Sequence, residues 1–551
     1  MADRVSSCLL DRGSHLCRTR VLSGIAYAPF CVWFSVLALL ILLPISGCHG
    51  KRTEADANTV RFLVESSPNN LDLRQGTDAQ SERMGALIFD ALVHKDEHFL
   101  LQPWLATSWE RPDPRTWVFH LRPGVRFHDG KPLTADDVVW SIHSMADGTL
   151  ATSKGGSFAG IASLAAPDPL TVEVHTREPD PGLLFNLSDG LFGVVEQGAG
   201  RDEGLHPVGT GAFRFVNQVQ DKEVVLERNA DWWNGPPKIG RVRFAVVPDN
   251  ISMALELKKG SADVESNAIT PDEVHALSSV QGLVTATRPG ADVYYANFNV
   301  IDPSLRDARV RQAIACAIDR QSLIRALWQG RAVAAETLLP PGHWAAAKAS
   351  ELPQYAFDPA RATALLEAAG LKPNSRGVRL RFTLKTSTDE TTRMLAQVLQ
   401  QQMRAVGIQL DLRSAEFGTF YADITHGAFQ MYILRWTGSN EDPDIFRYAD
   451  ATASFPPRGG NRGHYSNPRL DALLTSAAAE PDDARRRRDY VAAQQLLATD
   501  LPSIPLWYPD IVVVHSTRLT NLHLDPGGTF GFLRSAELVP TTKEAGLHPI
   551  R

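Results

Sequence analysis

A long uncharged run near the start of the sequence constrains what the rest of the chain can become. Residues 21–47 contain no charged side chain, and the most apolar part lies at residues 32–43. Four arginines precede the run: Arg4, Arg12, Arg18 and Arg20. A positive flank, an apolar run and small residues at its end are typical of an export signal. We therefore expect residues 1–47 to be a signal peptide; a retained membrane helix is the alternative, because the run is long.

The end of this run resembles a bacterial lipobox. Residues 43–48 read Leu-Pro-Ile-Ser-Gly-Cys, in which Ser46 and Gly47 suit the signal peptidase and Cys48 is the residue that would receive lipid. We predict that Cys48 is lipidated and that residues 48–58 form a polar tether. The remaining chain would then lie on the periplasmic or cell-surface side of a bacterial membrane.

Cysteine content and charge exclude several classes of protein. Removal of residues 1–47 leaves only Cys48 and Cys316, so a lipidated Cys48 permits no internal disulfide and no multi-cysteine metal site. The same removal changes the net charge from −6 to −8, which argues against nucleic acid as a partner. The sequence has no P-loop, no H-E-x-x-H and no G-x-S-x-G motif. We predict no enzymatic activity, no cofactor and no bound metal.

Helical and strand patterns interleave along the chain, which predicts an α/β fold. Alternating apolar residues predict strands at residues 60–64, 117–121 and 407–412. Capping signals and apolar residues at helical spacing predict helices at residues 134–145, 307–330, 359–369 and 394–403. In this interpretation Cys316 is a small buried hydrophobic residue on the apolar face of the second of these helices.

Three polar motifs have a functional and a structural interpretation. His94 and His98 could grip a metal from one helix face, but Lys-Asp-Glu between them favours a hairpin turn. His128 and Asp129 could form half of a catalytic dyad, although adjacent residues in a turn rarely face each other. The basic run at residues 485–488 predicts a solvated helix face, with contact to a partner or to lipid headgroups as the alternative.

The surroundings of Trp436 favour a binding site for a small polar solute. Residues 429–434 form a predicted strand, and Trp436, Thr437, Gly438 and Ser439 follow it closely. A flat indole beside hydroxyl groups and a glycine can offer an apolar wall together with backbone hydrogen bonds. The alternative is a buried tryptophan beneath an acidic loop.

An ordered set of motifs resembles the family 5 bacterial extracellular solute-binding proteins, which include dipeptide-, oligopeptide- and nickel-binding receptors. The most specific segment is residues 119–139, Phe-His-Leu-Arg-Pro-Gly-Val-Arg-Phe-His-Asp-Gly-Lys-Pro-Leu-Thr-Ala-Asp-Asp-Val-Val. Further matching segments lie at residues 105–110, 207–213, 229–233, 257–263 and 307–320. Taken in order, the matches cover about residues 59–540.

The resemblance implies a two-lobed periplasmic-binding-protein fold of the class II-like type, which closes about a hinge, with an extra subdomain in the first lobe. The implied boundaries are residues 59–299 for lobe I (with an inserted subdomain at about 81–205), 300–507 for lobe II, 508–540 for the return to lobe I, and 541–551 for a tail. The implied function is the monomeric, lipid-anchored binding component of an ABC importer. Its partners would be a small peptide-like solute, the permease subunits and the membrane.

The resemblance also carries over individual residues. In peptide-binding relatives an Asp three residues after the motif Trp pairs with the peptide α-amine, and here that position is Ser439. Glu441 or Asp442 could substitute if one of these carboxylates reached the cleft. This departure puts dipeptide capture in doubt.

A second departure concerns recognition of carboxyl termini. Some relatives use an Arg three residues before the motif Trp, where this chain has Ile433. Arg435 is nearby, but it should point to the face of the strand opposite Trp436. Residues 294–299 match the family's crossover strand. The predicted site residues are Trp436, Thr437, Ser439, Tyr295 and Asn297.

Two other functions stay open at this stage. One is a surface lipoprotein that acts as a sensory or protein-interaction subunit without transport, for which Ser439 at the amine-anchor position is the argument. The other is a binder of a nickel chelate or another non-peptide solute. A packed, dry interior beside Trp436 would favour the first, and a hydrated cavity there would favour solute capture.

Overall fold

The computed structural model describes residues 58–150 and 152–539. The predicted signal peptide, the lipidation site Cys48, nearly all of the predicted tether and the predicted tail lie outside the described residues, and they remain predictions. Within the described part of the chain, no helix combines the length and the apolar character needed to cross a bilayer.

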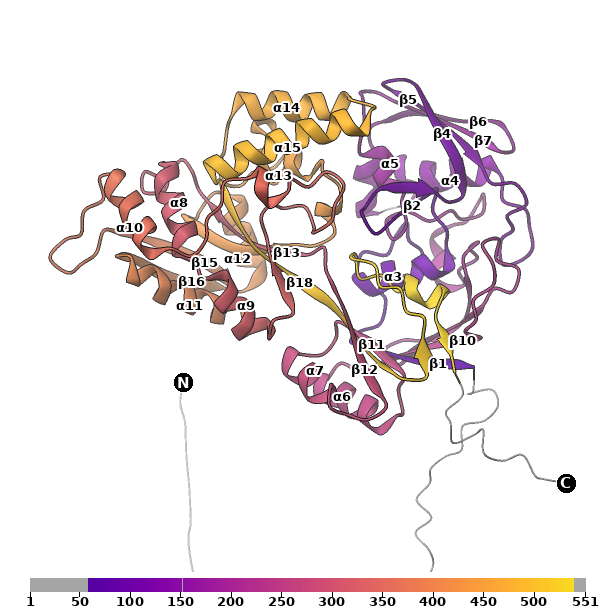
Figure 1. Cartoon of the computed structure of the whole chain (residues 1–551). Helices are drawn as coiled ribbons and strands as arrows, with labels where there is room; N and C mark the ends of the chain where they lie inside the picture. Colours follow the sequence, from indigo (N-terminus) through magenta and orange to yellow (C-terminus); the bar gives the residue numbers. More distant parts are fainter. Residues whose placement is uncertain (1–57, 151, 540–551) are drawn as a thin grey trace, which may run out of the picture. The chain divides into compact units, whose positions relative to one another are not determined.

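A mixed 12-stranded sheet forms the centre of the described structure (Figure 1). Its main path runs through β16 (Ile408–Ala415), β15 (Leu380–Ser387), β17 (Met431–Trp436), β13 (Val293–Phe298), β18 (Ser503–Ser516), β11 (Val264–Ser266), β1 (Thr59–Val64), β10 (Arg241–Val246), β9 (Glu223–Arg228) and β8 (Phe213–Val219). Two further strands, β12 (Leu283–Pro289) and β14 (Ala332–Ala334), pair with β18. β1 is parallel to β10 and β11, and β15 is parallel to β16 and β17.

The long strand β18 belongs to both halves of this sheet (Figure 1). Its first residues, 503–507, pair with β13, whereas residues 510–516 pair with β12. The chain passes from β12 to β13 through residues 290–292, beside the point where β18 changes partners. Two neighbouring connections therefore join the half that contains β13 to the half that contains β12.

Smaller sheets and helices surround the central sheet. An antiparallel sheet contains β4 (Ala106–Asp113), β5 (Thr116–Leu121), β7 (Thr171–Thr176) and β6 (Ile161–Asp168); hairpins or pairs are β2 (Val93–Lys95) with β3 (Leu101–Pro103) and β19 (Leu519–Thr520) with β20 (Glu537–Leu538). The helices up to residue 277 are α3 (Ala79–Ile88), α4 (Ala135–Ala146), α5 (Leu183–Asn186), α6 (Asn250–Lys259) and α7 (Pro271–Leu277).

The later helices cover the strands β13 to β17. They are α8 (Ala308–Ala317), α9 (Arg320–Trp328), α10 (Pro359–Ala368), α11 (Glu390–Ala405), α12 (Phe417–Thr425), α13 (Ile445–Asp450), α14 (Pro468–Ala479) and α15 (Asp483–Asp500). Short 3-10 turns are η1 (Ser153–Phe158), η2 (Arg201–Leu205), η3 (Ala349–Glu351), η4 (Ser439–Glu441), η5 (Thr452–Ser454) and η6 (Gly531–Arg534).

Buried cores hold the strands and helices together, and each core draws on a different set of elements. One core draws residues from β13, β15, β16, β17 and helices α8 to α11, and it includes the buried Cys316. A second core combines β1, β10 and α3 with residues 513–538, so the last described segment packs on the first described strand. A third lies between the β4 to β7 sheet and α4. The exact limits of the predicted lobes remain a prediction.

Most of the helices and strands that were predicted from local signals are present in the structure. The strands expected at residues 60–64, 117–121 and 407–412 are β1, β5 and β16. The helices expected at residues 134–145, 359–369 and 394–403 are α4, α10 and α11. The backbone N–H of Thr134 donates to Asp137 at 2.8 Å, as the capping box requires.

One predicted helix is wrong, because residues 307–330 form two helices. Ile318 adopts an extended backbone after α8, and Asp319 then caps α9 by accepting a hydrogen bond from the N–H of Ser322 at 2.9 Å. A short acceptor side chain of this kind favours a new helix start over continuation. The apolar stripe continues across the break because both helices contribute to the same core.

The two histidine motifs are structural turns. His94 and His98 lie on the β2–β3 hairpin, where His94 pairs with the carboxylate of Asp189 at 3.0 Å. His128 lies 3.0 Å from the backbone oxygen of Gly211, and burial lowers its pKa to about 4, so the neutral ring donates that bond. Its neighbour Asp129 pairs with Lys131 instead.

The basic run at residues 485–488 is solvated only in part. Arg485 and Arg488 are exposed, as predicted, but the guanidinium of Arg486 lies over Trp344 and that of Arg487 bonds to the Trp344 backbone oxygen at 3.1 Å. Four consecutive residues on a helix spread over its whole circumference, so they cannot all face water. The prediction of a single solvated face is therefore wrong for two of the four.

Candidate functional site

The candidate site lies where the two connections between the halves of the sheet touch. The N–H of Gly290 donates to the backbone oxygen of Pro509 at 3.0 Å, and a Cβ on Gly290 would lie 2.5 Å from that oxygen. The next residue, Ala291, donates to the oxygen of Pro526 at 2.8 Å. Because only a residue without a side chain fits at this approach, the sequence needs glycine at position 290.

Trp436 ends β17 directly beside this crossing. It is opposite Val293 in the sheet register, and its ring stacks on Tyr295 with 5.6 Å between centroids and 7° between planes. Tyr448 meets the Trp436 ring edge-on at 6.0 Å, and the Arg462 guanidinium lies 5.6 Å from its centroid. Such contacts fix the indole as a flat wall.

The other face of β17 has a separate set of contacts. Arg435 lies 3.6 Å from the carboxylate of Asp292, and its guanidinium lies over the ring of Tyr294. Alternation along a strand places Arg435 on the face opposite Trp436. The structure thus confirms that Arg435 is directed away from the Trp436 face.

The predicted site residues do not all occupy equivalent positions. Trp436 and Tyr295 are in contact, but Tyr295 is almost fully buried beneath the indole, with its hydroxyl 3.4 Å from that of Tyr432. Thr437 is exposed and lines a cavity of about 160 Å³. Asn297 is buried further along β13, and its Oδ1 has no hydrogen-bond partner among the described residues. The backbone of Ser439 opens η4, and its side chain lies outside what the structure describes.

The η4 turn after Trp436 is held rigidly. Asn440 is fully buried, and its amide donates to the backbone oxygens of Ala291 and Leu338 at 2.6 and 2.9 Å. Burial lowers the pKa of His343 to about 3, so its ring is neutral. The ring accepts from the N–H of Ala345 at Nδ1 and donates from Nε2 to the Glu441 backbone oxygen, each at 3.0 Å. The backbone of Glu441 is therefore fixed before any solute binds.

Glu441 forms an ion pair with Lys95, which lies 346 positions earlier on the β2–β3 hairpin. The ammonium nitrogen lies 2.6 Å from Oε2, and the two side chains are only 14% and 7% exposed. Burial lowers the pKa of Lys95, but the charges of Glu441, Asp189 and Asp525 outweigh this and raise it to about 12. Burial raises the pKa of Glu441, and the ammonium opposes that shift. At this separation we treat the pair as ionic.

Three cavities share Glu441 as a lining residue. We name them by one residue each: the Thr437 cavity of about 160 Å³, the Phe185 cavity of about 280 Å³ and the Arg534 cavity of about 540 Å³. Lys95 lines the Thr437 and Arg534 cavities, so the ion pair stands between them. A polar, partly enclosed space of this kind is a suitable binding site for a small polar solute. Of the predicted site residues, Thr437 lines one of these cavities, whereas Trp436, Tyr295 and Asn297 line none of the three.

Of the two carboxylates considered as replacements at the amine-anchor position, Glu441 contacts all three cavities. Asp442 lines only the Phe185 cavity among these, and burial together with the charge of Asp444 raises its pKa to about 6. Sequence reasoning identified Glu441 but missed its partner Lys95, as well as Asp189 and Arg534. No local signal marks them, because each enters the site through a contact between distant segments.

Metal binding has no prepared site in the described residues, where no group of three or more His, Cys, Asp or Glu side chains is arranged to hold an ion. The two histidines once considered as ligands are engaged elsewhere. His94 pairs with Asp189, and His98 lies 3.1 Å from the backbone oxygen of Gly342.

Comparison with known proteins identifies the family of this chain. Residues 101–454 match the family described as "Bacterial extracellular solute-binding proteins, family 5 Middle". The chain is 27% identical to the dipeptide-binding protein of Escherichia coli (strain K12) over 84% of this chain and 90% of that protein. It is 29% identical to the glutathione-binding protein GsiB of Pectobacterium atrosepticum over 86% of this chain and 92% of that protein.

A solved structure extends the match to the fold. The structure of NikZ from Campylobacter jejuni in complex with Ni(L-His) is 25% identical, covers 87% of this chain and 99% of that chain, and has a TM-score of 0.70. The two-lobed α/β periplasmic-binding-protein fold is thus confirmed, and the relatives are solute-binding proteins rather than enzymes, as predicted. The chain belongs to the family 5 bacterial extracellular solute-binding proteins.

Proposed function

We propose that this chain is the lipid-anchored component of an ABC importer that captures a peptide or a similar small polar solute. The observation that carries the proposal is the group of three cavities that meet at Glu441, five residues after Trp436 and beside the crossing of the two connections. Trp436 itself lines none of the three. A solute in this position would touch both of the sides that the crossing joins.

The proposed mechanism is reversible closure about the crossing at Gly290 and Pro509. Residues 59–299 with 508–540 would form one lobe and residues 300–507 the other. A solute stabilises the closed arrangement only through contacts that the open arrangement lacks. Contacts from Lys95 on one side and Glu441 on the other already span this boundary, which supports closure at this place.

The proposed solute contacts start from the Trp436 face. Trp436 would provide the apolar wall, with Tyr295 supporting it from below. Thr437 would offer a hydrogen-bonding group at the Thr437 cavity. Ser439, and Asn297 with its unsatisfied oxygen outside that cavity, are the other proposed contacts. Glu441 would take the part that an Asp takes at the position of Ser439 in peptide-binding relatives.

The proposed location and partners follow from the family and the N-terminal motif. Lipid on Cys48 would hold the chain at the periplasmic or cell-surface side of a bacterial membrane. The permease subunits of the importer would be its protein partners, and the binding protein itself would act as a monomer.

The two alternatives differ in their support. A sensory or protein-interaction subunit without solute binding predicted a packed interior beside Trp436. Trp436 lines none of the three cavities, so the support for solute capture comes from the cavity at the next residue, Thr437. A nickel chelate is favoured as a second candidate solute by the likeness to NikZ with Ni(L-His). His94 and His523, which both line the Arg534 cavity, are side chains that such a chelate could contact.

Thermal unfolding of the purified chain tests the proposal. The probes are Ala-Ala, Ala-Ala-Ala, glutathione and Ni(L-His), each over a range of concentrations. A solute that binds only the folded state stabilises it by about 2.7 kcal/mol at a hundred times its dissociation constant. A folded chain whose unfolding temperature no probe changes would contradict the proposal. Selective stabilisation by Ni(L-His) would favour the second candidate.

A further inference from the structure

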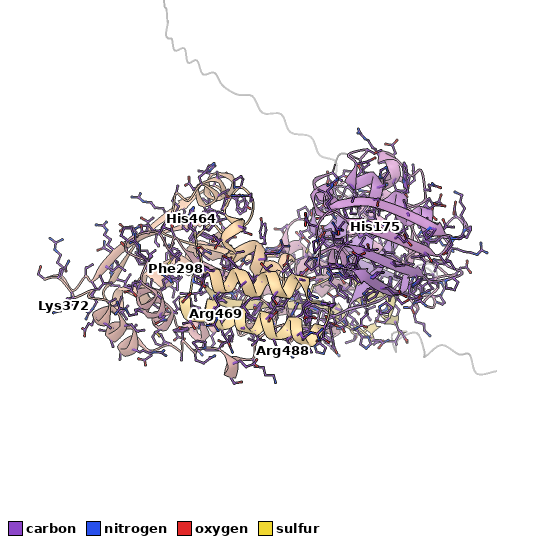
Figure 2. All side chains as sticks on the ribbon, turned by 90° about the horizontal axis from the view of Figure 1, so that it is seen from above. His175, Phe298, Lys372, His464, Arg469 and Arg488 are labelled. Atoms are coloured by element: carbon purple, nitrogen blue, oxygen red, sulfur yellow. The ribbon has the colours of Figure 1, made fainter. Side chains whose placement is uncertain are left out.

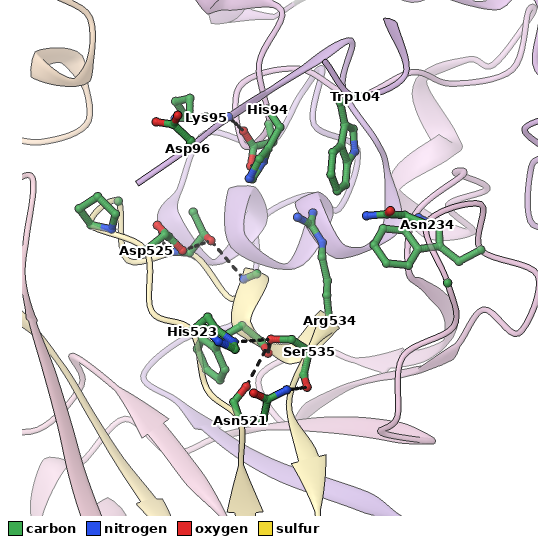
Figure 3. Close-up of a pocket in the computed structure, with 18 of the residues that line it drawn as sticks. His94, Lys95, Asp96, Trp104, Asn234, Asn521, His523, Asp525, Arg534 and Ser535 are labelled. Carbon is green, nitrogen blue, oxygen red and sulfur yellow. Dashed lines mark hydrogen bonds and ion pairs between the residues drawn. The ribbon is translucent and has the colours of Figure 1, made fainter. Parts of the chain in front are cut away.

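The Arg534 cavity is lined by the side chain of Arg534, a cation that has no part in the contacts around Trp436. Arg534 ends η6 in the return segment near the end of the chain, and it lines the cavity together with His94, Trp104 and Trp232. Figure 3 shows its side chain extending into the cavity toward the rings of His94 and Trp104. Those two rings lie 4.9 Å apart, and the guanidinium carbon lies 5.4 Å from the centroid of Trp104.

The guanidinium has unused hydrogen-bonding capacity. Its Nη2 donates to the backbone oxygen of Ala86 at 2.7 Å, whereas its Nε is buried and has no partner among the described residues. The carboxylate of Asp189 is engaged by His94 at 3.0 Å and by the backbone N–H of Lys95 at 3.1 Å. An arginine offers five N–H donors in one plane, and a buried donor without a partner is unfavourable.

A purely structural role accounts for only part of this arrangement. Ala86 lies in the last turn of α3, where backbone oxygens lack partners within the helix, so Arg534 acts as a cap there. That role uses one donor. It does not require the guanidinium to lie on an indole face inside a cavity of about 540 Å³.

We infer that Arg534 recognises a carboxylate of the solute, in a subsite walled by Trp104 and His94. The planar guanidinium matches the two oxygens of a carboxylate, and such paired, charge-assisted hydrogen bonds are stronger than neutral ones. Glu441 and Lys95 line the same cavity, so a solute with an amine and a carboxylate would find an opposite charge at both places. This inference rests on the proposed function and specifies the chemical class of its solute.

Binding of Ala-Ala-Ala and of its C-terminal amide, measured by titration calorimetry, tests the inference. The variants are Arg534→Met, Arg534→Lys, which keeps the charge but loses the planar fork, and Lys238→Met. Lys238 is the matched control because it is an exposed cation on the rim of the same cavity. We expect the wild type to bind the acid about tenfold to a hundredfold more tightly than the amide. Arg534→Met should abolish this preference, Arg534→Lys should reduce it, and Lys238→Met should keep it.

The outcomes separate this inference from the proposed function. If the wild type binds neither these peptides nor the other probes, the proposed function fails. If the wild type binds both forms equally, or if Arg534→Met keeps the preference for the acid, only the assignment of Arg534 fails. An equal loss in Lys238→Met would also overturn it, because a diffuse positive field would then explain the preference. If Arg534→Met does not fold because the helix cap is lost, Arg534→Lys decides the question. A full wild-type preference for the acid in Arg534→Lys would show that the planar guanidinium is not needed, and it would overturn the assignment.

Discussion

The ion pair between Lys95 and Glu441 allows a quantitative test of whether the two sides of the site are coupled without solute. Lys95→Met, Glu441→Gln and the double variant form a double-mutant cycle around one contact of 2.6 Å. The two single variants should not be equivalent. Loss of Lys95 leaves Glu441 beside the charges of Asp189 and Asp525, whereas loss of Glu441 leaves Lys95 with those same two carboxylates.

The geometry sets the size of the expected effect. Two unit charges at 2.6 Å attract by about 6 kcal/mol at an effective dielectric constant of 20, and desolvation of the two groups cancels much of this. We expect Lys95→Met to lower the free energy of unfolding by about 3 kcal/mol and Glu441→Gln to lower it by about 1–2 kcal/mol. The coupling energy from the cycle should be about 1–3 kcal/mol, since both side chains are largely buried.

Urea unfolding of the four proteins, followed by tryptophan fluorescence, measures the cycle. The matched control is the pair of Arg288 with Glu97, which also joins distant segments at 3.2 Å but is 29% and 62% exposed. Its coupling should stay at or below about 1 kcal/mol and should fall with added salt. The reasoning is refuted if the coupling of Lys95 with Glu441 is no larger than that of the control pair.

Three further predictions concern the crossing, the wall and a buried acid. Burial raises the pKa of Glu265 from 4.5 to about 8, so its stabilising contribution is complete below pH 4.5 and is lost as the pH rises through 8. Glu265 should contribute a loss of up to about 1.4 kcal/mol per pH unit in this window, so the unfolding midpoints of Glu265→Gln should fall less steeply with pH than those of the wild type. Trp436→Ala should cost about 2 kcal/mol of stability by removing the stack on Tyr295, and calorimetry should show Ala-Ala-Ala binding weakened at least about tenfold. Gly290→Ala should cost about 1–3 kcal/mol in urea unfolding because its Cβ would meet a backbone oxygen at 2.5 Å, whereas Gly200→Ala, where no atom lies within 4 Å, should be neutral.

The sequence predicts those parts of the fold whose causes are local. The strand β1 and the helix α10 follow from alternation and from an Asp-Pro start, and both signals act over fewer than ten residues. The single helix expected at residues 307–330 failed for a local reason as well. The expected range includes Asp319, whose carboxylate caps a second helix. A stripe of apolar residues reports a shared core and does not prove a continuous helix.

The site was less predictable than the fold because its contacts are long-range. Trp436 could be identified, since a strand and a glycine-containing turn surround it in the sequence. The stack of Trp436 on Tyr295 depends on the pairing of β17 with β13, and the contact of Lys95 with Glu441 depends on how the β2–β3 hairpin meets η4. No periodicity of either segment contains that information.

The ion pair of Lys95 with Glu441 also affects which solutes the site can select. Peptide-binding relatives have an Asp where this chain has Ser439, and Glu441 is the carboxylate proposed to replace it. If a solute amine replaces the Lys95 ammonium on Glu441, one cation replaces another and the exchange alone contributes little affinity. Selectivity must then come from the rest of the solute. A group that pairs with the displaced ammonium or with Arg534 would supply the missing free energy, because both cations line the same cavity. A solute with an amine but no carboxylate should therefore bind weakly, which distinguishes this site from one in which a free Asp accepts the amine.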